Sequence, residues 1–306
     1  MKILFFGTPK FAEMIFNGLL ENGFDVVGVV CQTDKPAGRG HKMISPHIVS
    51  VAREKGVNVY QFDKISTHIE DFKNIDFDYA VTASYGKILP KNFLDLFPCI
   101  NVHPSLLPRY RGATPVQTAL LNGDEKTGVT IMKTDVGVDD GDIYVQEEVE
   151  ILPEENFITL GEKVAKIANR LLAETLHKIE NGTQILVPQS DNGIVLCKMI
   201  KKEDAKLDFN KDASVLVNMV RAYVENPGAF FLLGDDRIKV FSAKVCELSS
   251  DKNAKIGEII PMKNRFIIKA KNGFFEILEC QCSGGKRMKA SDFVNGYHFV
   301  TRVVTE

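Results

Sequence analysis

The sequence predicts an α/β protein in which a doubly wound, mostly parallel sheet is followed by a small C-terminal β-barrel. Two patterns carry this prediction. Between residues 2 and 102, short apolar runs typical of buried strands alternate with amphipathic helical segments, as in a parallel sheet with helices on both faces. Beyond residue 206, a series of short strands follows one helix, and strands at this spacing indicate a small barrel.

The first elements of the chain set the pattern. Residues 2–6 form an apolar strand, a helix with apolar residues at every fourth position starts near Phe11, and residues 26–31 form the next strand. The intervening turn reads Gly7-Thr8-Pro9-Lys10 and lacks the further glycines that let a dinucleotide pyrophosphate approach the backbone. This beginning is Rossmann-like, but we expect no NAD or flavin cofactor.

The later elements extend the sheet and close a first domain. A helix is predicted to start at Pro46 with Ser45 as its N-cap. An amphipathic helix over residues 160–179 is expected to cover the sheet. The other predicted strands of this domain are residues 58–62, 79–84, 99–102, 129–132 and 143–151, with a helix at 114–121. The last two strands form an antiparallel pair, and the connection between them carries Asp139.

The second part of the chain begins after a polar connecting stretch. Its expected elements are a helix at residues 214–223 and strands at 229–233, 238–241, 256–260, 266–270 and 274–278. Residues 206–306 hold 16 Lys and Arg against 12 Asp and Glu (16 − 12 = +4), whereas residues 1–205 hold 22 against 28 (22 − 28 = −6). A basic module beside an acidic one is compatible with a polyanionic substrate, although an ordinary solvated surface explains so small an excess equally well.

Composition excludes several classes of protein. With 306 residues, of which 44% are hydrophobic and 25% charged, the chain is long enough for two domains or one large one. It has no uninterrupted apolar run of about eighteen residues, and its start has no small-residue cleavage pattern, so a cytoplasmic location is expected. The six cysteines are scattered, and Cys280 and Cys282 lack the spacing and the further ligands of a zinc site. We therefore expect core thiols and no metal.

The segment with the most chemical content follows the strand at residues 99–102. Asn101 and His103 lie two residues apart, so their side chains leave one side of a strand end where sheets of this type open a ligand crevice. Pro104 and Pro108 prevent the strand from continuing. Taken alone, His103 is better explained as an ordinary loop histidine and Asn101 as a turn cap, and the rest of the motif favours a functional site.

A second polar segment lies between the second strand and the helix at Pro46. Residues 32–44 contain Lys35, Arg39 and Lys42, and glycines flank the arginine on both sides. The composition predicts a mobile, basic loop. A surface loop of no functional consequence is the alternative that composition leaves open.

The motifs together resemble those of the folate-dependent formyltransferases. The resemblance rests on NVHPSLLPRYRG at residues 101–112, SYGKILP at 84–90, VDDGD at 138–142, PAGRG at 36–40 and SGGKRMKASDFVNG at 283–296, and it extends over essentially the whole chain. It implies a catalytic domain over residues 1–189, a linker over 190–205, and a C-terminal domain over 206–306 of the oligonucleotide-binding (OB) kind that binds tRNA.

The resemblance also implies roles for individual residues. Asn101, His103 and Asp139 match the catalytic trio of the family, and no metal takes part. The residues that match its folate contacts are Ser105, Leu106, Leu107, Pro108, Tyr85 and Gly86. Within PAGRG and its flanks, Arg39, Lys35 and Lys42 match a loop that engages the acceptor end of initiator tRNA. Asp140 and Asp142 are neighbours for which no role is implied beyond shaping the loop.

The trio suits formyl transfer chemically. An amine that attacks a formyl amide passes through a tetrahedral oxyanion, which needs hydrogen-bond donors and a route for the amine proton. Asn101 is a donor, a protonated His103 is a donor or an acid, and an ionised Asp139 accepts from the imidazole.

The implied activity is transfer of the formyl group of 10-formyltetrahydrofolate to the α-amino group of methionyl initiator tRNA. Formyl transfer to an amino-sugar nucleotide is the main alternative, because such enzymes share the core motif and a similar second domain but lack PAGRG. A glycinamide ribonucleotide formyltransferase would be a single smaller domain, and an RNA-binding protein with a degenerate enzyme domain would not need the intact trio.

Overall fold

The computed structural model describes residues 1–37, 42–248 and 254–296, and its chain divides into two compact units. The first unit comprises Met1–Pro115, Lys126–Glu150 and Gly161–Lys198. The second comprises Val116–Glu125, Ile151–Leu160 and Met199–Glu306, so two short segments that precede residue 161 group with the C-terminal part.

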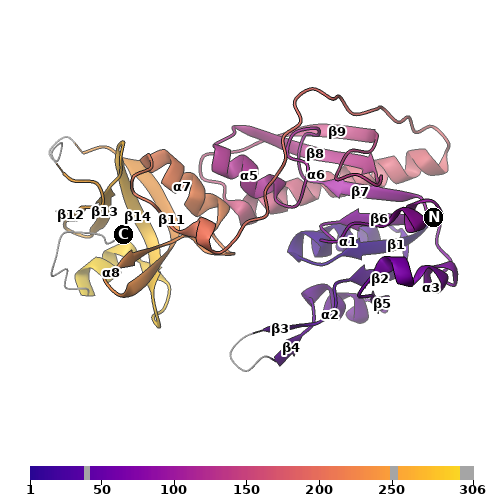
Figure 1. Ribbon diagram of the computed structural model, residues 1–306, viewed down its shortest axis with the longest axis horizontal. Helices are drawn as coiled ribbons and strands as arrows, with labels where there is room; N and C mark the ends of the chain where they lie inside the picture. Colours follow the sequence, from indigo (N-terminus) through magenta and orange to yellow (C-terminus); the bar gives the residue numbers. More distant parts are fainter. Residues whose placement is uncertain (38–41, 249–253, 297–306) are drawn as a thin grey trace. The chain divides into compact units, whose positions relative to one another are not determined.

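A seven-stranded sheet forms the centre of the first unit (Figure 1). Its strand order is β5-β2-β1-β6-β7-β8-β9, in which the strands from β5 to β7 are parallel, β8 is antiparallel to β7, and β9 is antiparallel to β8. The strands are β1 (Lys2–Gly7), β2 (Asp25–Cys31), β5 (Asn58–Gln61), β6 (Tyr79–Ala83), β7 (Cys99–His103), β8 (Lys126–Lys133) and β9 (Ile143–Glu150). After β1 the chain adds β2 and β5 on one side of β1, and then β6 and β7 on its other side. Such a topological switch point, here between β1 and β6, opens a crevice at the carboxyl ends of the strands.

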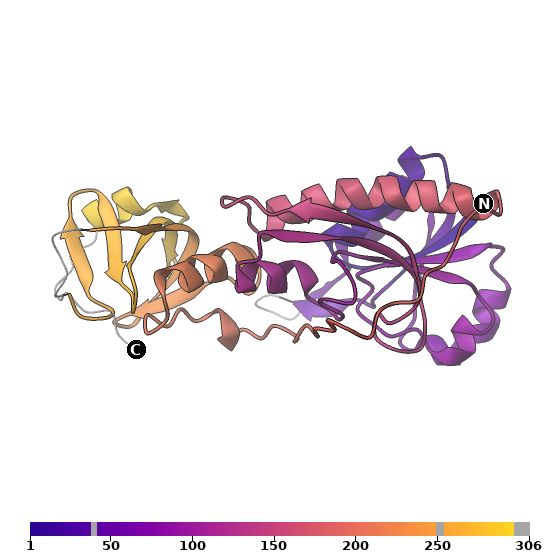
Figure 2. The same ribbon diagram turned by 90° about the horizontal axis from the view of Figure 1, so that it is seen from above.

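Helices cover both faces of this sheet, and α6 is the longest of those described. They are α1 (Lys10–Glu21), α2 (His47–Glu54), the 3₁₀ turn η1 (Ile65–Thr67), α3 (Ile69–Lys73), α4 (Lys91–Leu94) and α6 (Phe157–Glu180). Helix α5 (Pro115–Asn122) groups with the second unit from Val116 onward. Figure 2 shows α6 lying along the sheet. It begins three residues before the predicted start because Asn156 caps it, accepting from the backbone N–H of Ile158 at 2.9 Å and of Thr159 at 3.2 Å.

Aromatic side chains fill the core beneath the carboxyl ends of β1 and β6. The ring of Phe6 stacks on Phe72 and makes edge contacts with Tyr85 and Phe93, with centroid separations of 5.4 to 6.0 Å. All four side chains are buried. This packing holds the start of the Tyr85-Gly86 turn against the sheet.

The prediction of a loop at residues 32–44 is wrong for the part that the structure describes, because two short strands pair there. Strand β3 (Lys35–Ala37) pairs antiparallel with β4 (Lys42–Ile44). Pro36 does not prevent the pairing because a two-stranded ribbon has open edges that need no further donor. Residues 38–41, which include Arg39, lie outside the described residues.

The predicted N-cap of the next helix is also wrong. Helix α2 begins at His47, and Pro46 is the N-cap, with φ −53° and ψ 141°. The hydroxyl of Ser45 donates to Oδ2 of Asp34 at 2.9 Å, which closes the base of the hairpin instead of capping the helix. Competition from a nearby carboxylate therefore decided where the serine hydroxyl bonds.

The second unit contains an antiparallel half-barrel sheet with strand order β10-β11-β14-β13-β12, and β15 pairs with β14. Its elements are η2 (Glu203–Ala205), α7 (Ala213–Ala222), β10 (Phe230–Leu233), β11 (Asp236–Cys246), β12 (Ile259–Met262), β13 (Arg265–Lys269), β14 (Phe274–Cys282), β15 (Met288–Lys289) and α8 (Ala290–Gly296). The predicted fold class, a mostly parallel doubly wound sheet followed by a small antiparallel β-domain, is confirmed.

Three strands in this unit have other bounds than predicted, and two further elements were not predicted. Strands β11 and β14 continue through polar residues because each pairs on both sides in the middle of the sheet. Strand β12 lies three residues later than predicted, because Met262 pairs with Arg265 across a turn in which Asn264 has φ 60°. Strand β15 and helix α8 were not predicted, since each is short and polar.

None of the described helices is long and apolar enough to cross a membrane. All six cysteines lie in described parts of the chain and are thiols. Cys31, Cys99 and Cys280 are buried, and burial raises the pKa of their thiols to about 11, about 12 and about 12.

Candidate active site

The carboxyl end of β7 carries Asn101 and His103, and Asp139 from the β8–β9 connection lies against both side chains. Nδ2 of Asn101 donates to Oδ1 of Asp139 at 2.9 Å. Nδ1 of His103 lies 3.5 Å from Oδ2 of the same carboxylate. The structure therefore brings the three predicted catalytic residues into one cluster at the end of the sheet.

His103 is buried, with 3% of its surface exposed, and both of its ring nitrogens have a neighbour. Nε2 lies 2.9 Å from the backbone carbonyl oxygen of Tyr110, and because a carbonyl only accepts, Nε2 must carry a proton. The nitrogen that gains or loses a proton is therefore Nδ1, which faces Asp139.

The amide of Asn101 has a fixed orientation. Its Oδ1 accepts from the hydroxyl of Thr82 at 2.8 Å, while Nδ2 donates to Asp139. Exchanging the two amide atoms would place an oxygen against the carboxylate, so the opposite orientation is excluded. Within the described residues, the second N–H of this amide makes no hydrogen bond and is available to a substrate oxygen.

Asp139 is held by its backbone as well as by its side chain. Its φ of 49° lies in the left-handed region, which non-glycine residues rarely adopt. Oδ2 accepts from the backbone N–H of Gly112 at 2.8 Å, and the backbone oxygen accepts from Nε2 of Gln189 at 2.9 Å. Strained backbone held by several partners is common at active sites. Asp140, by contrast, is exposed, and Asp142 is half-buried.

The predicted folate-contacting turn, residues 105–108, is fixed to β8 and β9. The hydroxyl of Thr130 donates to the carbonyl of Ser105 at 2.6 Å, and Nε2 of Gln146 donates to the carbonyl of Leu107 at 2.8 Å. The side chains of Ser105 and Leu107 are buried, whereas those of Leu106 and Pro108 are partly exposed. A ligand at this turn would therefore meet Leu106, Pro108 and the backbone.

The other predicted folate contacts, Tyr85 and Gly86, form the turn after β6. The ring of Tyr85 is buried in the core, its hydroxyl has no described hydrogen-bond partner, and burial raises its pKa to about 12. Gly86 has φ 77°, and a Cβ there would lie 2.5 Å from the amide nitrogen of Gln32. The surface that this turn offers to a ligand is therefore its backbone.

The hairpin β3–β4 is connected to that same turn through Gln32. Nζ of Lys35 donates to Oε1 of Gln32 at 2.6 Å, and Nε2 of Gln32 donates to the carbonyl of Tyr85 at 3.0 Å. Lys42 begins β4 and pairs with Ala37. Of the predicted tRNA contacts, Lys35 and Lys42 thus lie at the two sides of the hairpin, and Arg39 lies outside the described residues.

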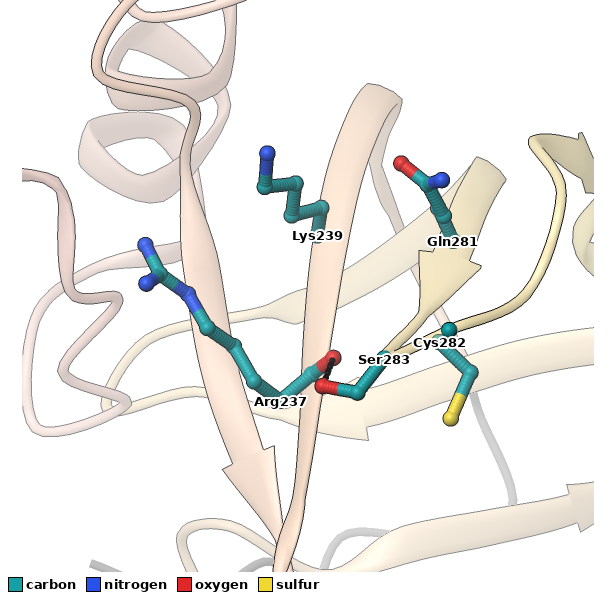
Figure 3. Close-up of a pocket in the computed structure, with 6 residues that line it drawn as sticks. Arg237, Lys239, Gln281, Cys282 and Ser283 are labelled. Atoms are coloured by element: carbon teal, nitrogen blue, oxygen red, sulfur yellow. Dashed lines mark hydrogen bonds between the residues drawn. The ribbon is translucent and has the colours of Figure 1, made fainter. Parts of the chain in front are cut away.

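A shallow pocket in the second unit is lined by basic and polar side chains from β11 and the end of β14 (Figure 3). Its lining residues are Arg237, Lys239, Gln281, Cys282, Ser283 and Gly284. The guanidinium carbon of Arg237 lies 3.6 Å from the ring centre of Phe230, and Nε of Arg237 is buried without a described partner. The sequence did not predict that these residues lie together, because Arg237 and Lys239 are about 45 positions away in the chain from Gln281–Gly284.

Sequence reasoning missed three residues that hold the cluster, Thr82, Gly112 and Gln189, and a fourth, Gln146, that holds the neighbouring Leu107 turn. Thr82 lies within the predicted strand at residues 79–84, and its pairing with Asn101 follows once the strand order is known. Gln189 gives no signal in the sequence, because it lies in a polar stretch 50 residues from the loop that it contacts. Among the described residues, no group of three or more His, Cys, Asp or Glu side chains could hold a metal ion.

Comparison with known proteins gives two family matches. The family described as Formyl transferase matches residues 1–176, and Formyl transferase, C-terminal domain, matches residues 199–298. The methionyl-tRNA formyltransferase of Ruminiclostridium cellulolyticum is 37% identical over 301 residues, which cover 97% of this chain and 96% of that protein. That of Thermodesulfovibrio yellowstonii is 40% identical over 299 residues, with 96% and 95% covered.

Solved structures with a similar fold are more distant in sequence. HypX from Aquifex aeolicus aligns with a TM-score of 0.68 at 16% identity, over 96% of this chain and 48% of HypX. WlaRD, a sugar 3N-formyl transferase crystallised with dTDP and 5-N-formyl-THF, aligns with a TM-score of 0.66 at 21% identity, over 92% of this chain and 97% of WlaRD. These similarities bear on the fold alone. With one family matching more than half of its residues and relatives matching nearly its full length, this chain belongs to the formyl transferase family, in the group of methionyl-tRNA formyltransferases.

Proposed function

We propose that this protein transfers the formyl group of 10-formyltetrahydrofolate to the α-amino group of methionine carried by initiator tRNA, in the cytoplasm, for initiation of translation. The observation that carries the proposal is the cluster of Asn101, His103 and Asp139 at the end of β7. Support for the acceptor comes from relatives named methionyl-tRNA formyltransferase over nearly the whole chain.

Asn101 supplies a donor for the charge that develops during the reaction. When the amine nitrogen bonds to the formyl carbon, the carbonyl oxygen becomes an oxyanion. The C–N10 bond then breaks, N10 takes up a proton, and the attacking nitrogen loses one. The unused N–H of Asn101 suits the oxyanion, because Thr82 and Asp139 already hold the rest of the amide.

We assign the transfer of the amine proton to His103 and Asp139. Nε2 of His103 is committed to the carbonyl of Tyr110, so transfer takes place at Nδ1 or through the adjacent carboxylate. Asp139 also accepts from Gly112 and Asn101, which keeps its two oxygens pointed into the cluster. An ionised Asp139 next to Nδ1 pairs with the imidazolium that forms when His103 takes the proton.

The folate co-substrate fits the two turns that flank this cluster. We assign Ser105, Leu106, Leu107 and Pro108 to one wall, and Tyr85 and Gly86 to the other. Thr130 and Gln146 hold the first turn, and Gln32 holds the second, so hydrogen bonds within the protein fix the shape of both. The partly exposed side chains of Leu106 and Pro108 suit the apolar face of a pterin ring.

Contact with tRNA is assigned to two regions. The first is the hairpin β3–β4 with Lys35, Arg39 and Lys42, which would meet the acceptor end. The second is the C-terminal domain, residues 206–306, in which Arg237 and Lys239 lie side by side on β11 in the pocket of Figure 3. Residues 1–189 form the catalytic domain in this proposal, and 190–205 the linker. An arginine stacked on an aromatic ring beside a lysine suits a phosphate or an unpaired base.

Formyl transfer to an amino-sugar nucleotide is the second candidate. The N-formyltransferase from Helicobacter canadensis, crystallised with folinic acid and dTDP-3-aminofucose, aligns with a TM-score of 0.65 at 18% identity. A shared core therefore does not separate the two acceptors. The PAGRG motif at residues 36–40 and the much higher identity to the methionyl-tRNA formyltransferases favour tRNA.

An acceptor comparison tests the choice. The purified protein is given 10-formyltetrahydrofolate with methionyl initiator tRNA, with a 4-amino-sugar nucleotide, or with glycinamide ribonucleotide. We expect formylation of the tRNA alone. Formylation of the sugar nucleotide alone would overturn the proposed acceptor while leaving the proposed chemistry of the trio intact.

A further inference from the structure

The side chain of Gln189 makes four hydrogen bonds between the Asp139 loop and Arg111. Nε2 donates to the backbone oxygen of Asp139 at 2.9 Å and to that of Gly141 at 2.7 Å. Oε1 accepts from Nε of Arg111 at 3.2 Å and from Nη2 of Arg111 at 2.8 Å. One amide therefore uses both of its N–H groups and both lone pairs of its oxygen.

The partners leave only one orientation for this amide. Arg111 can only donate, and the two carbonyl oxygens can only accept. Turning the amide over would set its NH₂ group against the guanidinium and its oxygen against two oxygens, and all four hydrogen bonds would be broken at once. Arg111 thus fixes the direction in which Gln189 presents its donors.

The two carbonyls that Gln189 holds flank the functional part of the loop. Asp139 has φ 49°, a backbone conformation that costs free energy and persists only where other contacts hold it. Arg111 lies next to Gly112, whose N–H donates to Oδ2 of Asp139. Gln189 therefore contacts both the backbone of Asp139 and the segment that orients its carboxylate.

The chain around Gln189 is fixed on both sides. Before it, Val187 exchanges two backbone hydrogen bonds with Ile143, at 2.8 and 2.9 Å. After it, Arg111 donates to the carbonyl of Val195 at 2.9 Å and accepts from the N–H of Cys197 at 2.8 Å. The chain that follows α6, residues 181–198, runs along the first unit as extended chain, and we call it the connector (Figure 2). Residue 189 also lies between the two family matches, which end at 176 and begin again at 199.

We propose that Gln189 is a positioning residue that holds Asp139 in its working geometry, an inference that rests on the proposed function. Gln189 does not touch the reacting atoms. Its effect passes through the backbone of the 139–141 loop to the carboxylate, and from there to His103 and Asn101. We call the four hydrogen bonds of the Gln189 side chain the clamp. Since a displacement of about 1 Å in a catalytic group costs up to about 10²-fold in rate, loss of the clamp should lower kcat.

Two substitutions separate the two halves of the clamp. Gln189→Met keeps the length of the side chain and removes all four hydrogen bonds. Gln189→Glu keeps the acceptor for Arg111 but sets a carboxylate oxygen against the carbonyls of Asp139 and Gly141. We expect both to lower kcat by about 10²-fold, with KM for 10-formyltetrahydrofolate and for methionyl initiator tRNA little changed.

Gln184 offers a matched control on the same connector. It is also half-buried, and its Nε2 donates to two backbone carbonyls, those of Tyr144 at 3.2 Å and Ile185 at 2.8 Å, neither of which belongs to the Asp139 loop. Gln184→Met should therefore keep the wild-type kcat. Thermal unfolding midpoints of all variants show whether a loss of rate reflects unfolding.

A double substitution tests whether Gln189 acts through Asp139. If it does, adding Gln189→Met to Asp139→Asn should cost much less than Gln189→Met costs alone, because the carboxylate that it positions is already gone. A wild-type kcat in Gln189→Met and Gln189→Glu would overturn the proposal. So would a full, multiplicative loss on top of Asp139→Asn.

Amide hydrogen exchange separates this proposal from the proposed function. Residues 112 and 135–142 should exchange faster in Gln189→Met and Gln189→Glu than in the wild type or in Gln184→Met, whatever the acceptor proves to be. If the wild type formylates no methionyl tRNA but the Gln189 variants still exchange faster at these residues, the proposed function fails and the clamp stands. Unchanged exchange in both Gln189 variants would overturn the clamp itself.

Discussion

Asn101 and Asp139 share a hydrogen bond of 2.9 Å, from Nδ2 to Oδ1, which joins the end of β7 to the β8–β9 connection. The pairing leaves one amide N–H of Asn101 for an oxyanion and fixes the carboxylate beside Nδ1 of His103. In the proposed mechanism each of these two residues depends on the other for its geometry, so substitutions within the trio should lower the rate in similar ways.

His103→Ala, Asn101→Ala and Asp139→Asn should each lower kcat by about 10² or more with tRNA affinity little changed, because these side chains act on charge that develops in the transition state. Single-turnover formylation measures the effect. Thr82→Val is a control that removes the donor to Oδ1 of Asn101 but keeps the Asn101–Asp139 pair, and its loss should be smaller. Near-normal turnover by folded His103→Ala protein would remove His103 from the mechanism.

Gly141 should not tolerate a side chain. A Cβ at this position would lie 2.0 Å from the backbone oxygen of Lys133, so the loop that carries Asp139 would have to move. Gly141→Ala is expected to lower the free energy of unfolding by about 1–3 kcal/mol and to lower kcat as well. Urea unfolding and single-turnover rates measure the two effects.

Gly161 is the matched control for that substitution. It lies inside α6, and a Cβ there would meet no atom within 4 Å. Gly161→Ala should raise the free energy of unfolding by about 0.5–1 kcal/mol, since alanine has the higher helix propensity, and should leave kcat unchanged. Equal stability changes for the two variants would mean that crowding by Lys133 does not restrict position 141.

The fold class and the shared side of Asn101 and His103 followed from short-range sequence patterns, whereas the trio that includes Asp139 followed from the resemblance to the formyltransferases. Apolar runs of strand length separated by amphipathic helices specify a parallel sheet, and the two-residue spacing of Asn101 and His103 puts both on one side of its end. The hairpin at Lys35 and the cap of α2 did not follow, because Asp34 competes for the hydroxyl of Ser45. A local pattern predicts that Ser45 caps the helix that follows it, but it does not show that the carboxylate of Asp34, eleven residues earlier, lies within hydrogen-bond distance.

The supporting contacts of the site were beyond sequence reasoning for a related reason. Gln146 and Gln189 reach the Leu107 turn and the Asp139 loop over separations of 39 and 50 residues. Glutamine in a polar stretch gives no periodic signal, and its partners are backbone atoms that exist at every position. Only the tertiary structure distinguishes these glutamines from Gln184.

Arg237 and Lys239 should contribute to the salt dependence of tRNA binding. If each side chain binds a phosphate, Arg237→Gln with Lys239→Gln should weaken binding and flatten the slope of log K against log salt by about 0.7–0.9 for each phosphate that is no longer bound. Lys255→Gln with Lys263→Gln removes the same charge from exposed positions near β12, at the other edge of the sheet, and should leave the slope nearly unchanged. Equal slopes for the two pairs would mean that net charge alone matters.

These substitutions are more informative than removal of the C-terminal part. Val116–Glu125 and Ile151–Leu160 group with the second unit, so a chain cut at the connector would lose packing partners of segments that it retains. Reduced tRNA binding by such a fragment would have two explanations. Point substitutions on β11 leave both units complete.

Arg39 should decide between an unpaired and a paired acceptor end. Glycines on both sides give the backbone freedom, and a guanidinium is a planar, permanently charged fork that stacks on a base or holds a phosphate by two hydrogen bonds. Arg39→Lys keeps the charge and loses the fork. We expect a large fall in kcat/KM for methionyl initiator tRNA, with folate binding unaffected.

The comparison that decides this role uses Arg39→Lys and Arg39→Ala on two tRNAs, initiator tRNA and a variant whose first acceptor pair is closed. If the guanidinium recognises the open end, both substitutions should cost far more on initiator tRNA than on the closed variant, because the closed end gives the fork nothing to stack on. Lysine would then be no better than alanine. If lysine restores activity, or if both variants lose the same factor on both tRNAs, position 39 acts through charge alone, and selectivity for the initiator must come from elsewhere on the chain.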